Sequence, residues 1–519
     1  MGPVRLRLTV PLLLLALVPA GAALTGPAAA ASTATVVDTG HSLAATVTGP
    51  GEGLLDLTVS APGADWSAAS TQSAVLEVDV DGIKATDLVV PSDTPTPRRV
   101  QLGTVTAGEH AVVVRLSPSS PRDTATVTGL AATAGQDVAL RYAPVVFGRT
   151  VAAYGGTTQN AVDDAPVIGW HEANPGAAPG TTTYEYSVIW TNEDNGTGSP
   201  DLMARYGRTV DIEYAIRETV VDATGAVVSE VFQGPNHVDT VFRGRHEGSH
   251  PLLQTCTGNN NFCDDATTPE GATAPVPVGG PLRFLLGYDE SRQPGRARES
   301  LVDRHPWVYP VMAAEQIREA KISQAVCLPQ ATDTVHICDQ RRYLYLEVAK
   351  TTGEPLDPTG TLQPIGISLG VVLRDGRVLR GDRGIPGRAA TRDVPVATTV
   401  ELPAGVTADD VVRVLGFRVD TQPSFPDPGS TVTVTGLARG FTFDDGYLPR
   451  PSFVTSTRRV VLPQDGSGAV LWDRAVEGAS PALPEFPAPA AAALVVLGLG
   501  LGLRSARRRD RGPRVTRGR

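Results

Sequence analysis

The side chains best suited to chemistry lie in one stretch of the 519-residue chain, between positions 184 and 250. They are carboxylates, one amide and three histidines: Glu185, Asn192, Glu193, Asp194, Asp211, Glu213, His237, His246 and His250. Such groups act as general acids and bases, or they bind metal ions. The first question is therefore which of them the fold brings together.

Asp211 and Glu213 are two residues apart in a segment that alternates apolar and polar residues. This spacing predicts that both side chains point to one face of a β-strand. Paired carboxylates on one face serve as general acid and base, or bind a metal ion. With Glu185 and His237, which can converge on the same face, they form the set of candidate catalytic residues. The alternative is a solvated strand face that nearby arginines neutralise.

Three consecutive polar residues, Asn192, Glu193 and Asp194, follow a segment rich in aromatic residues and precede Asn195-Gly196. Oxygen-bearing side chains on a short loop that ends in glycine suit calcium, which takes about six to eight oxygen ligands. These three are the candidate binding residues, and Asp194 is a candidate metal ligand. The alternative is a polar turn, because turns are rich in the same residue types.

The segment HEGSH, from His246 to His250, matches the HExxH zinc motif. That motif needs a helix, which places both histidines on one face. Gly248 is a poor helix residue and Pro251 follows directly, so the sequence predicts a turn after a strand instead. Zinc is therefore not expected. His246 and His250 remain candidate metal ligands only because histidine nitrogen can bind a metal ion.

Four cysteines fall into two pairs that are close in the sequence. An even number of cysteines in an exported chain favours disulfides, with three possible connectivities. We expect the local pairing, Cys256 with Cys263 and Cys327 with Cys338, because each bond would close a polar loop.

The elements around these residues indicate a mainly β fold with two or three sandwich or jelly-roll-like domains and one short helix. Alternating residues on either side of Asp81-Gly82, and again over 210–233, predict two hairpins. Helical spacing of apolar residues occurs only over 311–322. The expected domains are an N-terminal β-sandwich (32–142), a central β-rich domain with both disulfides (143–353) and a C-terminal β domain that can pack with it (354–475).

Both ends of the chain carry targeting patterns. Residues 1–31 combine a basic start, an apolar run and small residues for cleavage, as in a secretory signal peptide. The other end of the chain has three segments: a Pro/Ala-rich spacer (476–487), an apolar segment (488–503) and a tail with eight arginines (504–519). The apolar segment is just long enough for a transmembrane helix, and the arginines favour a cytoplasmic tail. We therefore expect a single-pass protein of the cell membrane whose N-terminal part is extracellular.

Three segments resemble known families. The order of spacer, apolar segment and arginine tail resembles the tripartite C-terminal signals of exported bacterial surface proteins. The Gly-x-His-x-Val-x-Val pattern that begins at Gly108 resembles a strand of jelly-roll carbohydrate-binding modules, which implies a sandwich fold. HEGSHP at 246–251 and DIEY at 211–214 resemble segments of Vps62-type β-sandwich domains, a resemblance that implies no particular activity.

The chain is acidic, with 55 Asp and Glu against 45 Lys and Arg and a formal net charge of −10. Such a surface repels phosphate backbones, so nucleic acid is not an expected partner. Together with the membrane anchor, this favours a surface protein that binds a cell-wall glycan, an ion or another surface protein. The alternative is a metal-assisted hydrolase or carbohydrate-active enzyme that uses Asp211, Glu213 and a histidine.

Overall fold

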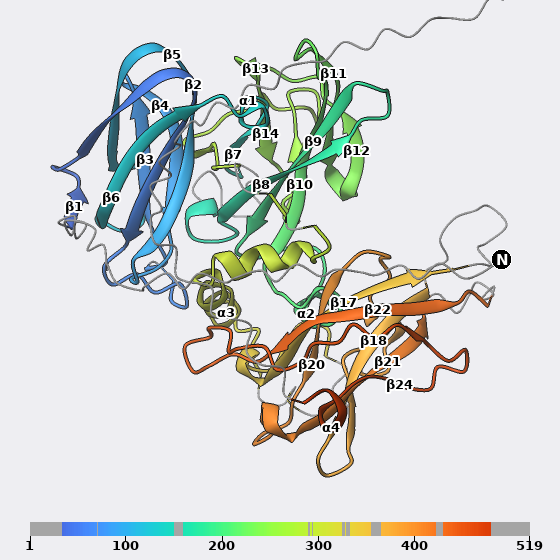
Figure 1. The fold of residues 1–519 in the computed structure, drawn as a ribbon. Helices are drawn as coiled ribbons and strands as arrows, with labels where there is room; N and C mark the ends of the chain where they lie inside the picture. Colours follow the sequence, from blue (N-terminus) through green and yellow to red (C-terminus); the bar gives the residue numbers. More distant parts are fainter. Residues whose placement is uncertain are drawn as a thin grey trace, which may run out of the picture.

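The computed structural model describes residues 34–69, 71–149, 159–288, 291–292, 294–323, 327, 333–353, 365–421 and 429–478. The predicted signal peptide, most of the spacer, the apolar segment and the arginine tail lie outside the described residues. Over the ranges that are described, no helix combines the length and apolar character needed to cross a membrane. The fold is mainly β, with several antiparallel sheets, as the sequence predicts (Figure 1).

The first part of the chain, blue in Figure 1, forms one six-stranded antiparallel sheet. In spatial order its strands are β1 (Thr35–Asp38), β6 (Thr124–Gly135), β2 (Leu43–Ser60), β5 (Thr96–Leu116), β3 (Ala74–Val80) and β4 (Ile83–Val90). Apolar side chains from all six strands pack in one core. The hairpin predicted at Asp81-Gly82 is confirmed, since these two residues join β3 to β4 and both have positive φ.

The middle of the chain forms two sheets that share a core. The larger sheet is antiparallel, in the order β12 (Val238–Val241), β11 (Val227–Gly234), β10 (Asp211–Val221), β9 (Thr181–Trp190) and β8 (Pro166–Pro175). The smaller sheet contains β13 (His246–Glu247), β14 (His250–Thr255), β7 (Val145–Phe147) and β16 (Arg283–Phe284), with β15 (Phe262–Cys263) paired to β14. The core between them also takes in Trp66 and Val75, so the N-terminal sheet packs against this part.

The last part of the chain is a sandwich of two four-stranded sheets around a third core. One sheet has the order β20 (Val396–Glu401), β17 (Tyr343–Thr352), β22 (Val432–Phe441) and β23 (Val460–Val461). The other has the order β19 (Val378–Arg380), β18 (Ile365–Leu373), β21 (Val411–Asp420) and β24 (Ala469–Asp473). Strand β17, which lies before position 354 in the sequence, thus pairs within this C-terminal sandwich.

Short helices join the central sheets to the C-terminal sandwich (Figure 1). The α-helices are α1 (Val138–Arg141), α2 (Ser199–Tyr206), α3 (Val308–Arg318) and α4 (Arg474–Glu477). The 3-10 turns are η2 (Gln159–Ala161), η3 (Pro235–His237), η4 (Arg298–Arg304), η6 (Gln340–Arg342), η7 (Pro386–Arg388) and η8 (Ala408–Asp410). A fourth core combines side chains of α2, η4 and α3 with Ile212 of the central sheet and with Tyr345 and Phe441 of the sandwich.

The expectation of a single helix over 311–322 was therefore incomplete. Helix α3 begins earlier and ends at Arg318, where Ala320 adopts a positive φ. Helix α2 was missed because its eight residues are too few to show a helical period, although Pro200 in its first turn and the left-handed Gly207 at its end are ordinary helix boundaries. The segment HEGSH forms β13, a turn with Gly248 at positive φ and the start of β14, as predicted.

Two carboxyl groups face each other inside the larger central sheet. Glu218 on β10 lies directly opposite Glu230 on β11, and Glu218 is fully buried. Burial and the neighbouring Glu230 raise the pKa of Glu218 from 4.5 to about 10. The folded protein therefore holds a proton here that the unfolded chain releases near its ordinary pKa, so stability falls as the pH rises between these values.

Replacement of Glu218 by glutamine keeps the shape of the protonated acid and removes the titration. We expect Glu218→Gln to raise the free energy of unfolding by about 2 kcal/mol at pH 8 and by much less at pH 5. Urea denaturation at the two pH values measures the difference. The control Glu109→Gln, at an exposed position of β5, should change neither value; equal effects of Glu218→Gln at both pH values would contradict the protonated state.

Candidate functional site

Three buried carboxylates converge where β9 ends and β10 begins. Asp211 pairs with Trp190 in the antiparallel register of these strands. The loop that leaves β9 therefore starts beside Asp211, and it returns Glu193 to the same place. One oxygen each of Glu193, Asp211 and Glu213 lies within 4.8 Å of the other two. All three residues are buried, at 6%, 2% and 7% exposure, so most of their charge is removed from water.

Amide side chains hold these carboxylates from neighbouring elements. Asn260 donates from Nδ2 to Asp211 Oδ2 at 3.0 Å and to the backbone oxygen of Asn192 at 2.9 Å. Gln233, on β11, donates from Nε2 to Glu213 Oε2 at 2.6 Å. The loop that carries Asn260 is closed by the Cys256–Cys263 disulfide, so the bond fixes the position of an amide that contacts the carboxylates.

The amide oxygens around the carboxylates have no hydrogen-bond donor. Oδ1 of Asn260, Oδ1 of Asn261 and Oε1 of Gln233 are buried and unpartnered within the described part of the chain. These residues are only 0%, 1% and 5% exposed. A buried carbonyl oxygen without a partner costs about 1–3 kcal/mol, so these oxygens favour a positively charged ligand or a proton donor. We call this set of six residues the carboxylate–amide site.

His237 lies at the rim of the site. Its ring is half exposed, with Nδ1 at 3.6 Å from Glu213 Oε1 and Nε2 at 2.8 Å from Nδ2 of Asn259. The hydrogen bond with Glu213 raises the pKa of His237, although partial burial opposes the shift. His237 and the preceding Asn236 both have positive φ, a conformation that a non-glycine residue holds at a cost and that is frequent at functional sites.

Gly196 closes the loop over the carboxylates at very short range. A Cβ at this position would lie 2.2 Å from Asn259 Oδ1 and 2.8 Å from Glu193 Oε2. A side chain at position 196 would therefore displace the ends of the Asn259 and Glu193 side chains. The loop also donates to Glu193, because the backbone N–H of Thr197 lies 2.6 Å from Oε1.

The electrostatics of the site favour protonation when no cation is bound. Burial, followed by repulsion from Glu213 and Glu193, raises the pKa of Asp211 well above its ordinary value. Burial also raises the pKa of Glu193, although Arg208 and the N–H of Thr197 oppose that shift. A cation at this place would replace bound protons, so the site couples cation binding to proton release.

Four of the candidates from the sequence lie away from this site. Glu185 pairs with Arg217 at 2.6 Å, further along the same two strands. His246 contacts Glu230 at 2.6 Å. The other two are Asp194 and His250. His250 donates from Nδ1 to the backbone oxygen of Ala143 at 2.8 Å, and its Nε2 lies 3.3 Å from Glu52 Oε2.

Asp194 belongs to a second acidic group, with Asp163 and Asp164. Arginines pair directly with this group and offset part of its charge. Arg149, fully buried, contacts Asp164 and lies 3.5 Å from Asp194 Oδ2, and Arg318 lies 2.8 Å from Asp163 Oδ1. Glu193 and Asp194 are adjacent in one loop but belong to two different acidic groups. Arginines pair directly with the group of Asp194, whereas amide side chains contact the group of Glu193.

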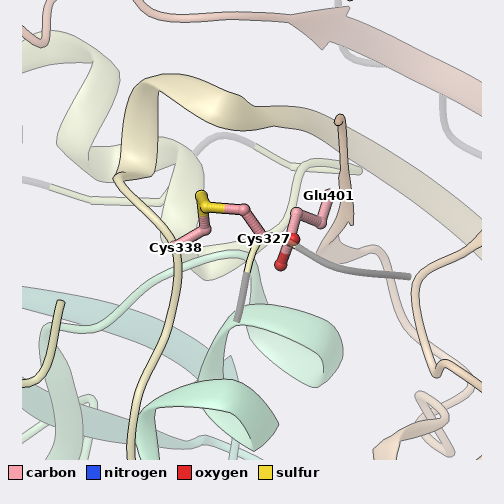
Figure 2. A group of neighbouring side chains, drawn as sticks. All are labelled: Cys327, Cys338 and Glu401. Carbon is pink, nitrogen blue, oxygen red and sulfur yellow. A yellow bond between two sulfur atoms is a disulfide. The ribbon is translucent and has the colours of Figure 1, made fainter. Parts of the chain in front are cut away.

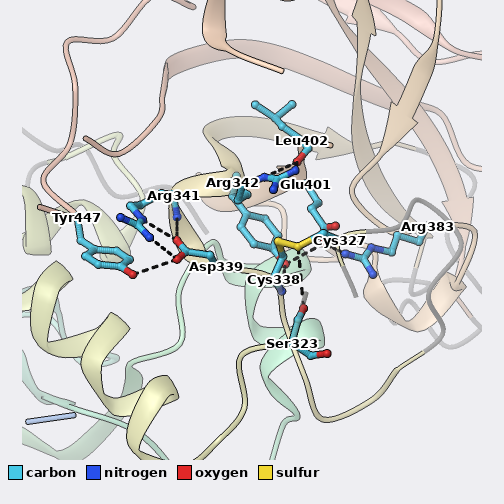
Figure 3. The surroundings of a disulfide bond; sticks show 11 residues. Ser323, Cys327, Cys338, Asp339, Arg341, Arg342, Arg383, Glu401, Leu402 and Tyr447 are labelled. Carbon is cyan, nitrogen blue, oxygen red and sulfur yellow. Dashed lines mark hydrogen bonds and ion pairs between the residues drawn. A yellow bond between two sulfur atoms is a disulfide. The ribbon is translucent and has the colours of Figure 1, made fainter. Parts of the chain in front are cut away.

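Both disulfides have the expected local pairing. The second one lies beside Glu401, and the sulfur atoms of Cys327 and Cys338 with one Glu401 oxygen form a compact group (Figure 2). Sulfur in a disulfide is not a thiolate and is no ordinary metal ligand. Glu401 also has protein partners, since it pairs with Arg383 (Figure 3). It accepts a hydrogen bond from the Tyr343 hydroxyl at 3.0 Å. We therefore regard this group as structural.

Comparison with known proteins leaves the chain without a family. No protein-family model matches it, and no curated protein matches it. Among solved structures, the sugar-binding C-terminal domain of EclA is 11% identical, with a TM-score of 0.16 over 21% of this chain and 83% of that chain. A ruminal GH26 endo-beta-1,4-mannanase is 20% identical, with a TM-score of 0.14 over 20% of each chain. Scores this low support no argument about fold or function.

The cost of the crowded carboxylates leads to a stability prediction. With chelator present at pH 8, Asp211→Asn should raise the free energy of unfolding by about 1–3 kcal/mol, because the raised pKa of Asp211 makes its ionised form unfavourable in the folded protein. The gain should shrink at pH 5, because the free-energy cost of protonating this carboxyl on folding falls as the pH approaches its ordinary pKa. Chemical denaturation at both pH values gives the comparison.

Glu185→Gln is the matched control, because it removes a carboxylate that is paired with Arg217 instead of crowded. It should give no gain in stability at either pH. A loss of stability in Asp211→Asn at pH 8 would show that this carboxylate is not under electrostatic strain.

Proposed function

We propose that the protein is an exported surface protein whose central domain binds a divalent cation, of the calcium class, at the carboxylate–amide site. One observation carries the proposal: three buried carboxylates converge, and the two amide side chains that donate to them, Asn260 and Gln233, each keep a buried oxygen without a donor in the described part of the chain. Carboxylate and amide oxygens are the kinds of ligand that calcium takes.

The donor atoms favour calcium over zinc. Zinc prefers histidine nitrogen and cysteine sulfur, whereas the convergent groups here are oxygens. His237 is the nitrogen at the rim, and its Nδ1 faces Glu213 and the Gln233 amide, with Gln233 Nε2 at 2.5 Å. Magnesium keeps several water ligands and suits a site this enclosed less well.

An enzyme that uses Asp211, Glu213 and a histidine is the second candidate, and the contact of His237 with Glu213 favours it. Burial favours binding over catalysis. Both Asp211 oxygens already accept hydrogen bonds, from the Ile212 N–H at 2.8 Å and from Asn260. A general acid or base must reach a substrate proton, and a residue at 2% exposure with both oxygens engaged is poorly placed to do so.

Calcium titration of the purified full-length chain in detergent tests the proposal. We expect stoichiometric binding by isothermal titration calorimetry, proton release on binding at neutral pH and a rise in thermal stability with calcium. Glu193→Gln should weaken calcium binding at least tenfold, since it removes one of three charged ligands.

The neighbouring residue provides the matched control for that variant. Asp194→Asn should leave calcium affinity unchanged, because Asp194 lies in the group balanced by Arg149. Gly196→Ala keeps every ligand but places a methyl group against Asn259 and Glu193, so it should also weaken binding. Equal affinities in Glu193→Gln and Asp194→Asn would refute the site.

The surface location is proposed from the ends of the chain and from the two disulfides, which suit an oxidising compartment. In a bacterial host that processes the signal, the full chain should sediment with membranes, and protease added to intact cells should cleave it. A chain that stops at position 478 should appear in the medium. Retention of that shorter chain in the membrane fraction would argue against an anchor at 488–503.

A further inference from the structure

Three arginines surround the ring of Tyr206, the last residue of α2. The guanidinium carbons of Arg205, Arg208 and Arg392 lie 4.9, 5.1 and 5.6 Å from the ring centre. Arg205 and Arg208 belong to the end of α2 and the residues after it, whereas Arg392 precedes β20 of the C-terminal sandwich. Two distant parts of the sequence thus bring positive charge to one place in an acidic protein.

Arg298, at the start of η4, adds a fourth guanidinium to this arginine group. Its Nε lies 3.4 Å from Glu299 Oε1, and the same oxygen lies 3.5 Å from Nε of Arg208. Glu299 is thus a single carboxylate shared between two arginines. In the described ranges, no Asp or Glu oxygen lies within 4.0 Å of the guanidinium of Arg205 or Arg392. The arginine group therefore carries more positive charge than its carboxylate balances.

The charges of the group affect one another. Burial, followed by repulsion from Arg298, lowers the pKa of Arg392, and Arg208 adds to the repulsion. Arg392 lies among the other charged side chains beside Tyr206, yet part of its surface stays open to solvent, where a ligand can reach it. An oxyanion bound between these arginines would relieve the repulsion.

Arg298 connects the arginine group to the carboxylate–amide site. Burial lowers the pKa of Arg298, but attraction to Glu299, Glu213, Tyr206 and Asp211 raises it overall. Arg298 also acts on the pKa of His237, at the rim of the site. The chain itself joins the two charged groups, because Arg208 of the arginine group donates to the backbone oxygen of Val210, the residue before Asp211.

We propose that the arginine group binds an oxyanion, a carboxylate or phosphate group of an extracellular ligand, beside the cation held by Glu193, Asp211 and Glu213. The inference rests on the proposed function, because the cation and the oxyanion are parts of one binding site. Planar guanidinium groups match carboxylate and phosphate oxygens with paired hydrogen bonds, and the cation offers a second point of attachment. Polymers of acidic sugars and phosphodiester polymers both supply this chemistry.

Binding of three probes to the full-length chain in detergent tests the inference, with and without calcium. The probes are a galacturonate trimer, inorganic phosphate and a neutral galactose trimer. We expect at least one of the two anions to bind, with an affinity that falls about tenfold in chelator, and no binding of the neutral trimer. Preference for galacturonate or for phosphate distinguishes the two sources of oxyanion.

Arg392→Gln should weaken anion binding about tenfold and leave calcium affinity unchanged, because Arg392 is exposed and its loss need not disturb the fold. Arg377→Gln, at an exposed hairpin position, is the matched control and should change neither affinity. Calcium binding without anion binding would overturn the inference and leave the proposed function standing. Anion binding that ignores calcium would overturn the inference too, and failure of calcium binding itself would refute the proposed function.

Discussion

The repulsion among three buried carboxylates is the constraint on which the central domain depends. Like charges a few ångströms apart in a medium of low dielectric constant are unfavourable, and each buried carboxylate also loses its hydration. The structure holds Glu193, Asp211 and Glu213 together nonetheless, by the register of β9 and β10 and by amide donors on a disulfide-closed loop. Arg208 offsets part of this negative charge, and a proton or a cation can neutralise what remains.

The loop after β9 shows that this imbalance is specific to one place. Its residues Glu193 and Asp194 are adjacent, yet Asp194 enters a group in which Arg149 and Arg318 supply the opposite charge. Among the carboxylates of the site, amides make the direct side-chain hydrogen bonds, and Arg208 offsets part of the charge without an ion pair to them in the described ranges. A purely structural cluster resembles the group of Asp194, in which arginines pair with the carboxylates. A site for a cation resembles the group of Glu193. The contrast between two groups on one loop is the basis for assigning function to only one.

Local patterns in the sequence were sufficient for much of the fold. Alternation predicted the hairpin of β10 and β11, and therefore the common face of Asp211 and Glu213. Glycine and proline correctly argued against a helix at His246. Contacts between distant segments were beyond reach, since no local pattern reports that Asn260 bonds Asp211 or that β17 joins the C-terminal sandwich. The run of asparagines between Cys256 and Cys263 was the one sequence feature that could have indicated amide groups at the site. An ordinary polar loop has the same composition, so the run alone could not predict the contact.

A crystal structure of the protein grown with calcium, with anomalous scattering recorded, tests the central claim most directly. The account predicts one strong anomalous peak among Glu193, Asp211 and Glu213, at about 2.3–2.6 Å from carboxylate and amide oxygens. A peak in the group of Asp163, Asp164 and Asp194, or none at either place at saturating calcium, would contradict it.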